Sequence, residues 1–244
     1  MTGDVRLVLG AIILLALACG ALWLAGVAQL RAVLTASLRA AVQLAIVAAA
    51  LRGVFAAPWA VIAVLAVMFT VATVTAARRL RDHPDILRAT VCACGLGAGA
   101  VIAVIVGLPT LSRDVRTLVA VSGIVLGGTM TAATLTGRRL HEALVRRRDE
   151  VEAWLSIGAT SRHAVRPLAR EAVFEALVPA LDQTRTVGLV TLPGAFVGAL
   201  LGGASAVDAA RFQIVVLVGL LAAEAITATV LARWLGAPAV LPES

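Results

Sequence analysis

The sequence contains no lysine, so all 21 of its basic residues are arginines. Without a lysine the chain cannot form a Walker A phosphate loop or a Schiff base, and it has no lysine general base. If ATP drives this protein, a separate chain must therefore bind the nucleotide. The chain itself is expected to bind no cofactor.

Cysteine and histidine are scarce, with three of each. Cys19, Cys92 and Cys94 lie within apolar runs, which indicates no disulfide framework. Cys92 and Cys94 project about 200° apart on a helix, so we interpret them as small core residues rather than ligands of one metal ion. No HxxxH, HExxH or GxSxG pattern occurs, and the sequence gives no support for an enzyme.

Apolar side chains are in excess, because 61% of the residues are hydrophobic and only 14% are charged. A soluble core of this size cannot bury so much apolar side chain, which predicts an all-α polytopic membrane protein. The whole chain, 1–244, is interpreted as a single transmembrane domain. We expect about seven spans, each near the ~20 apolar residues that a bilayer requires, at 6–27, 33–54, 58–77, 87–108, 115–136, 177–203 and 210–235.

Arginine placement predicts the orientation of the chain. With the N-terminus outside, the arginines in the outer segments are only Arg6, Arg52, Arg113, Arg116 and Arg211. Because inner loops collect basic residues, the pattern predicts an outer N-terminus, a cytoplasmic C-terminus and a cytoplasmic segment at 138–172. The net charge of +7 therefore reflects topology, and no nucleic-acid partner is expected.

Four polar groups lie in or at the ends of the predicted spans. Asp182 and Arg185 are spaced i,i+3 near the inner boundary, as a structural ion pair or as part of an inner mouth. Glu224 is close to mid-span without a basic neighbour one turn away, so it must be protonated, paired with another helix or in contact with water. Gln43 offers a helix–helix hydrogen bond or a polar group on a transport path.

Small residues recur at four-residue spacing in three of the predicted spans. Such stripes let helix backbones approach closely within a membrane. They serve either packing within the chain or a subunit interface and sliding surface. The stripes are Gly95, Gly99, Ala103 and Gly107; Gly123, Gly127 and Thr131; and Gly194, Gly198 and Gly202.

The polar segment between the fifth and sixth predicted spans has helical character. Residues 138–152 are expected to extend the fifth span into the cytoplasm, and Gly158 to end that helix. Thr160 or Ser161 can cap a second, short helix through Arg170. This helix would either lie on the lipid surface or form a rigid knob for a soluble partner.

Several segments match a known family in order and wording. The pair Glu152-Ala153 followed by Gly158 resembles the EAA loop, by which ABC-transporter permeases dock on their ATPase. Over most of its length the chain resembles the FetB (YbbM-type) permease family, which is associated with iron export and related to a plant aluminium-tolerance membrane protein. The matching segments are RAAVQL from Arg39, GIVLG from Gly123, SIGAT from Ser156 and VGLVTLPG from Val187, followed by Gly198, Ala209, Gln213 and Ile214.

The resemblance implies an ABC permease that exports a metal ion such as iron. It implies a homodimer in a bacterial plasma membrane, surrounded by lipid, with two ABC ATPase subunits that hold ATP and Mg²⁺. The residues expected to couple to the ATPase are Glu152, Ala153, Gly158, Ala159, Thr160 and Arg166.

A hinge and a transport path complete this interpretation. The sixth span would bend at Pro193-Gly194, because the proline leaves the carbonyl of Leu189 without a helical partner. The residues expected along the path are Gln43, Met130, Asp182, Gln183 and Glu224.

Two departures from the family concern the substrate. Gly128 follows Gly127 where the family usually has asparagine, and Ala195-Phe196 follows Gly194 where the family usually has two methionines. Thioethers are soft metal ligands, so their absence weakens the inference of iron. The alternatives are an ABC permease for a non-metal substrate, an ATPase-independent secondary transporter or channel, an assembly factor and, least favoured, an intramembrane enzyme.

Overall fold

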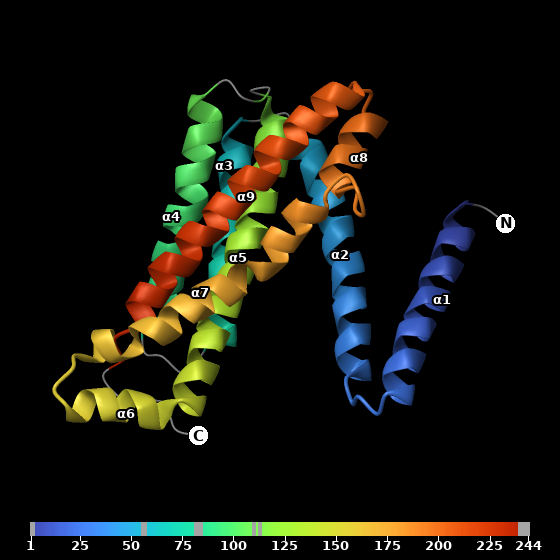
Figure 1. Cartoon of the computed structure of the whole chain (residues 1–244). Helices are drawn as coiled ribbons and strands as arrows, with labels where there is room; N and C mark the ends of the chain where they lie inside the picture. Colours follow the sequence, from blue (N-terminus) through green and yellow to red (C-terminus); the bar gives the residue numbers. More distant parts are fainter. Residues whose placement is uncertain (1–2, 55–57, 81–84, 109–110, 112–113, 239–244) are drawn as a thin grey trace. The chain divides into compact units, whose positions relative to one another are not determined.

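The computed structural model describes residues 3–54, 58–80, 85–108, 111 and 114–238. These residues form helices and turns without a strand, which confirms the all-α class (Figure 1). Arg113, one of the arginines behind the predicted orientation, lies outside the described residues. The helices are α1 (Gly3–Leu24), α2 (Leu30–Val54), α3 (Pro58–Arg79), α4 (Ile86–Gly107), α5 (Val115–Arg146), α6 (Arg148–Ser156), α7 (Ser161–Thr186), α8 (Gly194–Leu201) and α9 (Ala206–Leu235).

Two compact units divide the chain, residues 1–58 and 59–244. In the first unit, α1 and α2 are joined by a tight turn in which Gly26 has φ 68°. The N–H of Val27 donates to the carbonyl of Leu22 at 2.9 Å, which satisfies one of the carbonyls left over at the end of α1. Gln43 lies on α2 and therefore belongs to this N-terminal unit.

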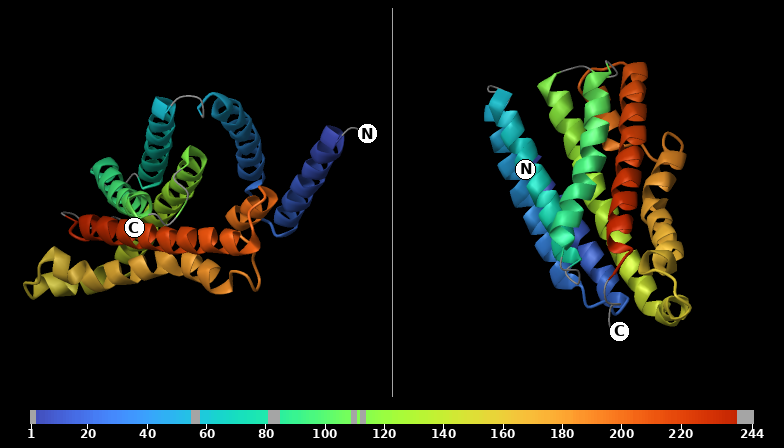
Figure 2. Two further views of the ribbon diagram at one scale, coloured as in Figure 1. Left: turned by 90° about the horizontal axis from the view of Figure 1, so that it is seen from above. Right: turned by 90° about the vertical axis from the view of Figure 1, so that its left-hand side faces the viewer.

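The second unit is organised around α9, which packs against α4, α5, α7 and α8. Both views of Figure 2 show α9 between α4 and α7. Fully buried apolar residues from the helices of this unit, among them Val125, Leu168 and Leu231, form its core. The helices α1 to α5 and α9 are long and apolar enough to cross a membrane, by length and composition.

Two glycines allow the helices of this core to approach closely. A Cβ atom on Gly97 of α4 would clash with the hydroxyl of Thr227 and lie 2.6 Å from the carbonyl oxygen of Ala223. A Cβ atom on Gly128 of α5 would clash with the side chain of Leu220. Since all three contacting residues lie on α9, these glycines set how close α9 comes to α4 and α5.

The predicted stripes of small residues take little part in this packing. Cβ atoms built on Gly99, Gly107, Gly127 and Gly198 meet no heavy atom within 4 Å, whereas one on Gly123 would lie 3.0 Å from Met68. Within the second unit, packing therefore explains Gly123 and Gly95, whose Cβ would lie 3.5 Å from Phe69, but not Gly99, Gly107, Gly127 or Gly198. Their use as a subunit interface stays a prediction.

The range 177–203, predicted as one span, is divided in the structure. It holds the end of α7, an irregular turn from Val187 to Pro193, and α8. The helix predicted to end at Arg170 contains Pro167 and continues through Pro179 into this range, so that α7 is one helix of 26 residues. Together α7 and α8 lead from the α6 end of the unit to its opposite end (Figure 1). Helices α7 and α8 together therefore replace the single membrane span predicted for 177–203.

Candidate functional site

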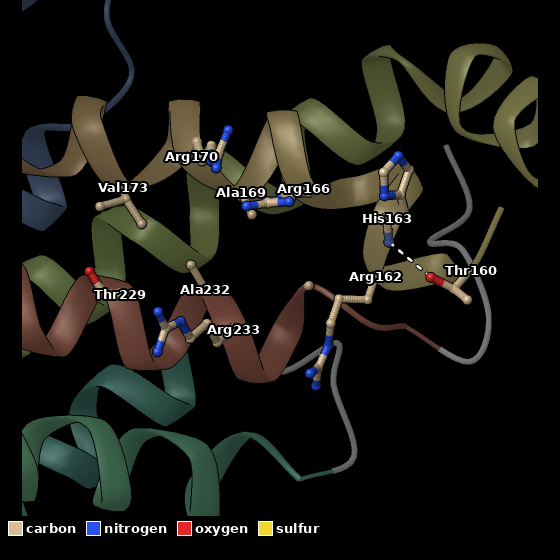
Figure 3. A pocket seen from close by; sticks show the side chains of 11 residues that line it. Thr160, Arg162, His163, Arg166, Ala169, Arg170, Val173, Thr229, Ala232 and Arg233 are labelled. Carbon is tan, nitrogen blue, oxygen red and sulfur yellow. Dashed lines mark hydrogen bonds between the residues drawn. The ribbon is translucent and has the colours of Figure 1, made fainter.

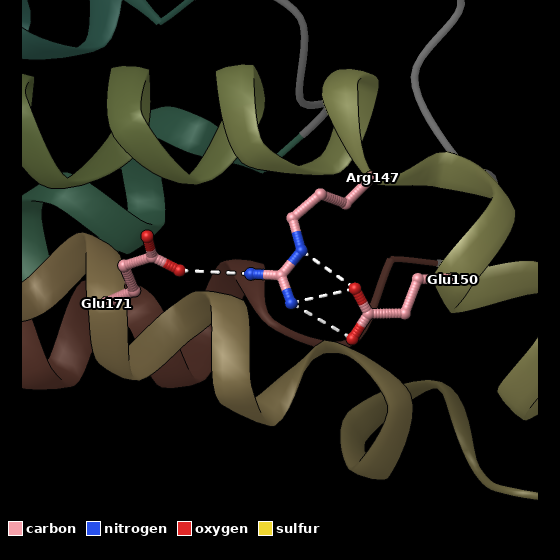
Figure 4. Close-up of polar contacts among 3 residues, drawn as sticks. All are labelled: Arg147, Glu150 and Glu171. Carbon is pink, nitrogen blue, oxygen red and sulfur yellow. Dashed lines mark hydrogen bonds and ion pairs between the residues drawn. The ribbon is translucent and has the colours of Figure 1, made fainter.

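Helix α6 is held against the ends of α5 and α7 by one arginine. Arg147, between α5 and α6, pairs with Glu150 at 2.7 Å and with Glu171 of α7 at 3.1 Å (Figure 4). Val151 is 1% exposed and anchors α6 in the core below it. Exposed ion pairs contribute little stability singly, typically about 0–1 kcal/mol. Their effect here is to fix the direction in which α6 leaves the bundle.

The turn from α6 to α7 has the geometry that the sequence predicted. Gly158 has φ 89°, a left-handed conformation that favours glycine. The N–H of Ala159 donates to the carbonyl of Trp154 at 3.0 Å, which closes the end of α6. Thr160 caps α7, because its hydroxyl accepts from the N–H of His163 at 3.3 Å. The Gly158 break and the Thr160 cap are thereby confirmed.

Three large apolar side chains are exposed at this turn. Trp154 is 40% exposed, Leu155 37% and Ile157 75%. We refer to Trp154, Leu155 and Ile157 as the apolar knob. The indole of Trp154 packs edge-to-face on His163 with ring centroids 5.7 Å apart, so the knob is braced against the first turn of α7. Neighbouring exposed apolar side chains of this kind are typical of a surface that contacts another molecule.

The predicted coupling residues gather at this turn, with one exception. Glu152 pairs with Arg148 at 2.7 Å on α6, one residue before the exposed Ala153. Ala159 and Thr160 follow in the turn. Arg166 lies farther along α7, where it lines a cavity between α7 and α9 (Figure 3).

The break between α7 and α8 is a hydrogen-bonded turn. The carbonyl of Thr186 accepts from the N–H groups of Leu189 at 3.2 Å and of Val190 at 3.0 Å. Gly188 has φ 80°, and its N–H donates to the carbonyl of Thr191 at 2.9 Å. These bonds give the non-helical stretch between α7 and α8 a defined conformation.

The predicted hinge has a different structural basis from the one expected. Pro193 is the N-cap residue of α8, and Gly194 is the first residue of that helix. Leu189 lies in the turn and is 89% exposed, so the proline interrupts no helical bond to its carbonyl. The expectation of a bend within a continuous helix is wrong, because the chain leaves the helix six residues earlier, at Val187.

Polar side chains stand at the α7 side of the break. Asp182 and Arg185 form the expected ion pair at 3.6 Å, and both side chains are largely exposed. Gln183 is exposed beside them. These polar groups lie within two helical turns of the non-helical segment Val187–Pro193. They are therefore suitably placed to contact a solute that reaches this segment.

Glu224 is buried at the contact between α9 and α5. Its side chain is 8% exposed and has no hydrogen-bond or ion-pair partner among the residues that the structure describes. A Cβ atom on Gly128 would lie 2.7 Å from its carboxyl oxygen, so the missing side chain at that position makes room for the carboxyl group. Gly128, where the sequence departs from the asparagine usual in the family, is thus next to the carboxyl group of Glu224.

Met130, another predicted path residue of the same unit, is not brought to Glu224. Met130 is about 200° around α5 from Gly128 and packs on the core cluster that includes Cys94. Gln43 belongs to the other unit. Cys92 is exposed and Cys94 buried, as expected for residues on opposite faces of α4.

Sequence reasoning missed three buried polar groups. Among the described residues, the hydroxyls of Ser122 and Thr136 and the side-chain oxygen of Gln213 are buried without a hydrogen-bond partner. Within the described ranges, no three His, Cys, Asp or Glu side chains are grouped so that they could hold a metal ion.

Six of the described helices, α1 to α5 and α9, are long and apolar enough to cross a membrane. They define a multi-pass membrane protein. The chain belongs to the family described as "Uncharacterised protein family (UPF0014)", whose model matches residues 5–239. This match supports the resemblance drawn from the sequence.

The relatives carry several names. The UPF0014 membrane protein STAR2 of rice is 34% identical over 84% of this chain and 73% of its own length. The probable iron export permease protein FetB of Escherichia coli is 30% identical over 81% of this chain and 76% of its own length. Protein ALUMINUM SENSITIVE 3 of Arabidopsis thaliana is 33% identical over 71% of this chain and 64% of its own length. No solved structure matches the chain.

Proposed function

We propose that this protein is the membrane-spanning subunit of an ABC-type transporter that exports a metal ion. A separate ATPase subunit would hold ATP and Mg²⁺ and supply the energy, because this chain has no lysine for a phosphate loop. We propose a complex of two permease and two ATPase chains in a bacterial plasma membrane, with the α6 end facing the cytoplasm. The name of the FetB relative supports the permease role and the metal.

The apolar knob is the main observation that supports this proposal. It protrudes between two helices whose directions are fixed by ion pairs and by a buried valine, so a force applied to it is transmitted rather than absorbed. Exposed Ile157 at its tip is suited to enter an apolar groove of a partner, with Glu152 and Ala153 at the side. Apolar side chains that become buried in a partner's groove, as Ile157 would, contribute most of the binding energy at protein interfaces.

The transmission would run along α7. Trp154 contacts His163 in the first turn of α7, and α7 continues as one helix to the break at Val187. A displacement of the knob would therefore change the position of the Thr186 turn and of Asp182 and Gln183 beside it. The backbone oxygens of that turn would offer the substrate hard ligands without a preformed metal site.

Replacing Ile157 by aspartate tests this docking role. We expect Ile157→Asp to lower co-purification of an ABC ATPase from the same genome by about tenfold, because an apolar anchor is replaced by a charge. Arg146→Gln is the matched control, since it makes the same change in charge at an exposed position of α5 outside the knob. Equal co-purification with both variants would contradict the docking assignment.

Neutralising Glu224 tests the transport path. We expect Glu224→Gln to keep the thermal stability within a few degrees, because the shape is retained, and to lower the apparent affinity for exported Fe²⁺ about tenfold, because a charge-assisted contact is lost. Efflux from vesicles that contain the complete complex is the measurement. Glu175→Gln, which removes an exposed carboxylate paired with Arg139 at 3.2 Å, is the control. An unchanged affinity would restrict Glu224 to packing.

A non-metal substrate is the second candidate. It is favoured by the lack of a three-ligand group in the described part of the chain and by Ala195-Phe196 in place of two methionines. Metal content of cells that lack the gene distinguishes the two candidates. Metal export predicts accumulation of iron or another metal, whereas a non-metal substrate predicts unchanged metal content.

A further inference from the structure

A cavity of about 600 Å³ lies between the first half of α7 and the last turns of α9. Its wall carries four arginines from two helices (Figure 3). Arg162, Arg166 and Arg170 follow one another at four-residue spacing along one face of α7, and Arg233 comes from the last turn of α9.

Among the described residues, the positive charge of this cavity is not compensated. None of the four arginines has an ion-pair partner within 4 Å among the described residues, and no acidic residue lines the cavity. By contrast Arg139 and Arg147, on the same side of the unit, are both paired with glutamates of α7. Like charges four residues apart on a helix repel one another. An anion between α7 and α9 would remove that cost.

The rest of the lining is apolar or uncharged. Ala169 and Val173 on α7 lie opposite Ala232 and Thr229 on α9, and a Cβ atom on Gly236 would come 3.8 Å from that of Ala169. Both helices therefore supply basic as well as apolar or uncharged lining to the cavity. A small inorganic anion would fill only the basic part.

The cavity also lies where a membrane surface is expected. Arg233 is in the last turn of α9, a helix long and apolar enough to cross the bilayer. Trp234 next to it is 42% exposed, and tryptophan is enriched at membrane–water interfaces. Arginine side chains at this depth lie level with lipid phosphates, and basic pockets between membrane helices bind anionic headgroups.

We propose that this cavity binds an anionic phospholipid, with its phosphodiester held by Arg166, Arg170 and Arg233 and its glycerol and upper acyl chain against Ala169, Val173 and Ala232. The guanidinium fork matches two phosphate oxygens at once, which a point charge does not. The bound lipid would join α7 to α9 beside the coupling turn. The site does not depend on the proposed ATPase partner.

Lipid binding by the purified permease alone tests the proposal. Native mass spectrometry in a neutral detergent would compare phosphatidylglycerol, phosphatidylcholine and inorganic phosphate. We expect phosphatidylglycerol to bind at least about tenfold more tightly than phosphatidylcholine, and inorganic phosphate at high excess to compete weakly. Arg166→Gln combined with Arg170→Gln should lower phosphatidylglycerol affinity by roughly tenfold or more. Arg138→Gln combined with Arg146→Gln removes the same charge outside the cavity and should leave the affinity unchanged.

Other outcomes overturn the proposal. These are equal binding of the two lipids, an equal loss in both double variants, or phosphate competing as strongly as phosphatidylglycerol, which would indicate a simple anion site. A lipid affinity unchanged by the cavity variants, together with loss of ATPase association, would assign the arginines to the ATPase instead. If the double variant does not fold, Arg233→Gln alone must still weaken phosphatidylglycerol binding.

Discussion

Gly97→Ala is expected to destabilise the protein by about 3 kcal/mol, or to prevent its accumulation, although it adds a single methyl group. The new Cβ would lie 2.6 Å from the carbonyl oxygen of Ala223 and would clash with the hydroxyl of Thr227. A backbone oxygen in the middle of a 30-residue helix cannot move aside by itself. Helices α4 and α9 would have to separate, and overpacking of a core costs typically about 1–3 kcal/mol or more.

The separation would also break a hydrogen bond across the core. The hydroxyl of Thr227 donates to the carbonyl of Ala93 at 3.3 Å, one turn before Gly97. Thermal unfolding of the purified protein in detergent measures the combined effect. Gly99→Ala is the control on the same helix, because a Cβ there meets no heavy atom within 4 Å. Similar unfolding temperatures for the two variants would show that α4 and α9 are not in close contact.

Gly158→Val is expected to abolish the coupling of a partner ATPase while the membrane core stays folded. A β-branched residue is strongly disfavoured at φ 89°. Forcing it there costs of the order of 1–3 kcal/mol, which the exposed turn can avoid by changing its conformation. The knob would then point elsewhere. Stimulated ATPase activity of the reconstituted complex should fall to the level of the ATPase alone.

A second glycine supplies the matched control for this prediction. Gly203, between α8 and α9, has φ 92° and, like Gly158, no heavy atom within 4 Å of a built Cβ. The junction of α8 with α9, to which it belongs, is at the end of the unit opposite to α6 (Figure 1). Gly203→Val imposes the same backbone strain without touching the knob, so it should keep most of the stimulated activity. Equal losses would mean that strain alone, and not docking, explains the effect of Gly158→Val.

Local signals in the sequence predicted the backbone of the turn between α6 and α7. The Gly158 break and the Thr160 cap depend on backbone conformation and on one side chain each, and neighbouring residues decide both. The Asp182–Arg185 pair follows from helical spacing alone. The predicted extension of the fifth span over 138–152 is found only as far as Arg146, because the chain turns at Arg147 and Arg148–Ser156 form the separate helix α6, which is the helix that the Gly158 break ends.

Features that depend on distant residues were not predictable in this way. Hydropathy cannot tell a continuous helix from α7, a turn and α8, because the turn Val187–Pro193 is as apolar as the helices around it. Four-residue spacing selected Gly99 and Gly127, yet the close contacts use Gly97 and Gly128, since the position of α9 decides which face is covered. The juxtaposition of Gly128 with Glu224 has the same origin.

The length of α9 has a mechanical consequence. Its 30 residues make a rod of about 45 Å. One end is tied to the start of α7, where the Ser161 hydroxyl donates to the carbonyl of Pro238 at 3.0 Å, and the other end carries α8. If the rod pivots at the tied end, a tilt of about 5° moves the far end by about 4 Å. A tilt of α9 that hardly moves the side chains near the arginines would therefore displace α8 by more than the width of a bare metal ion.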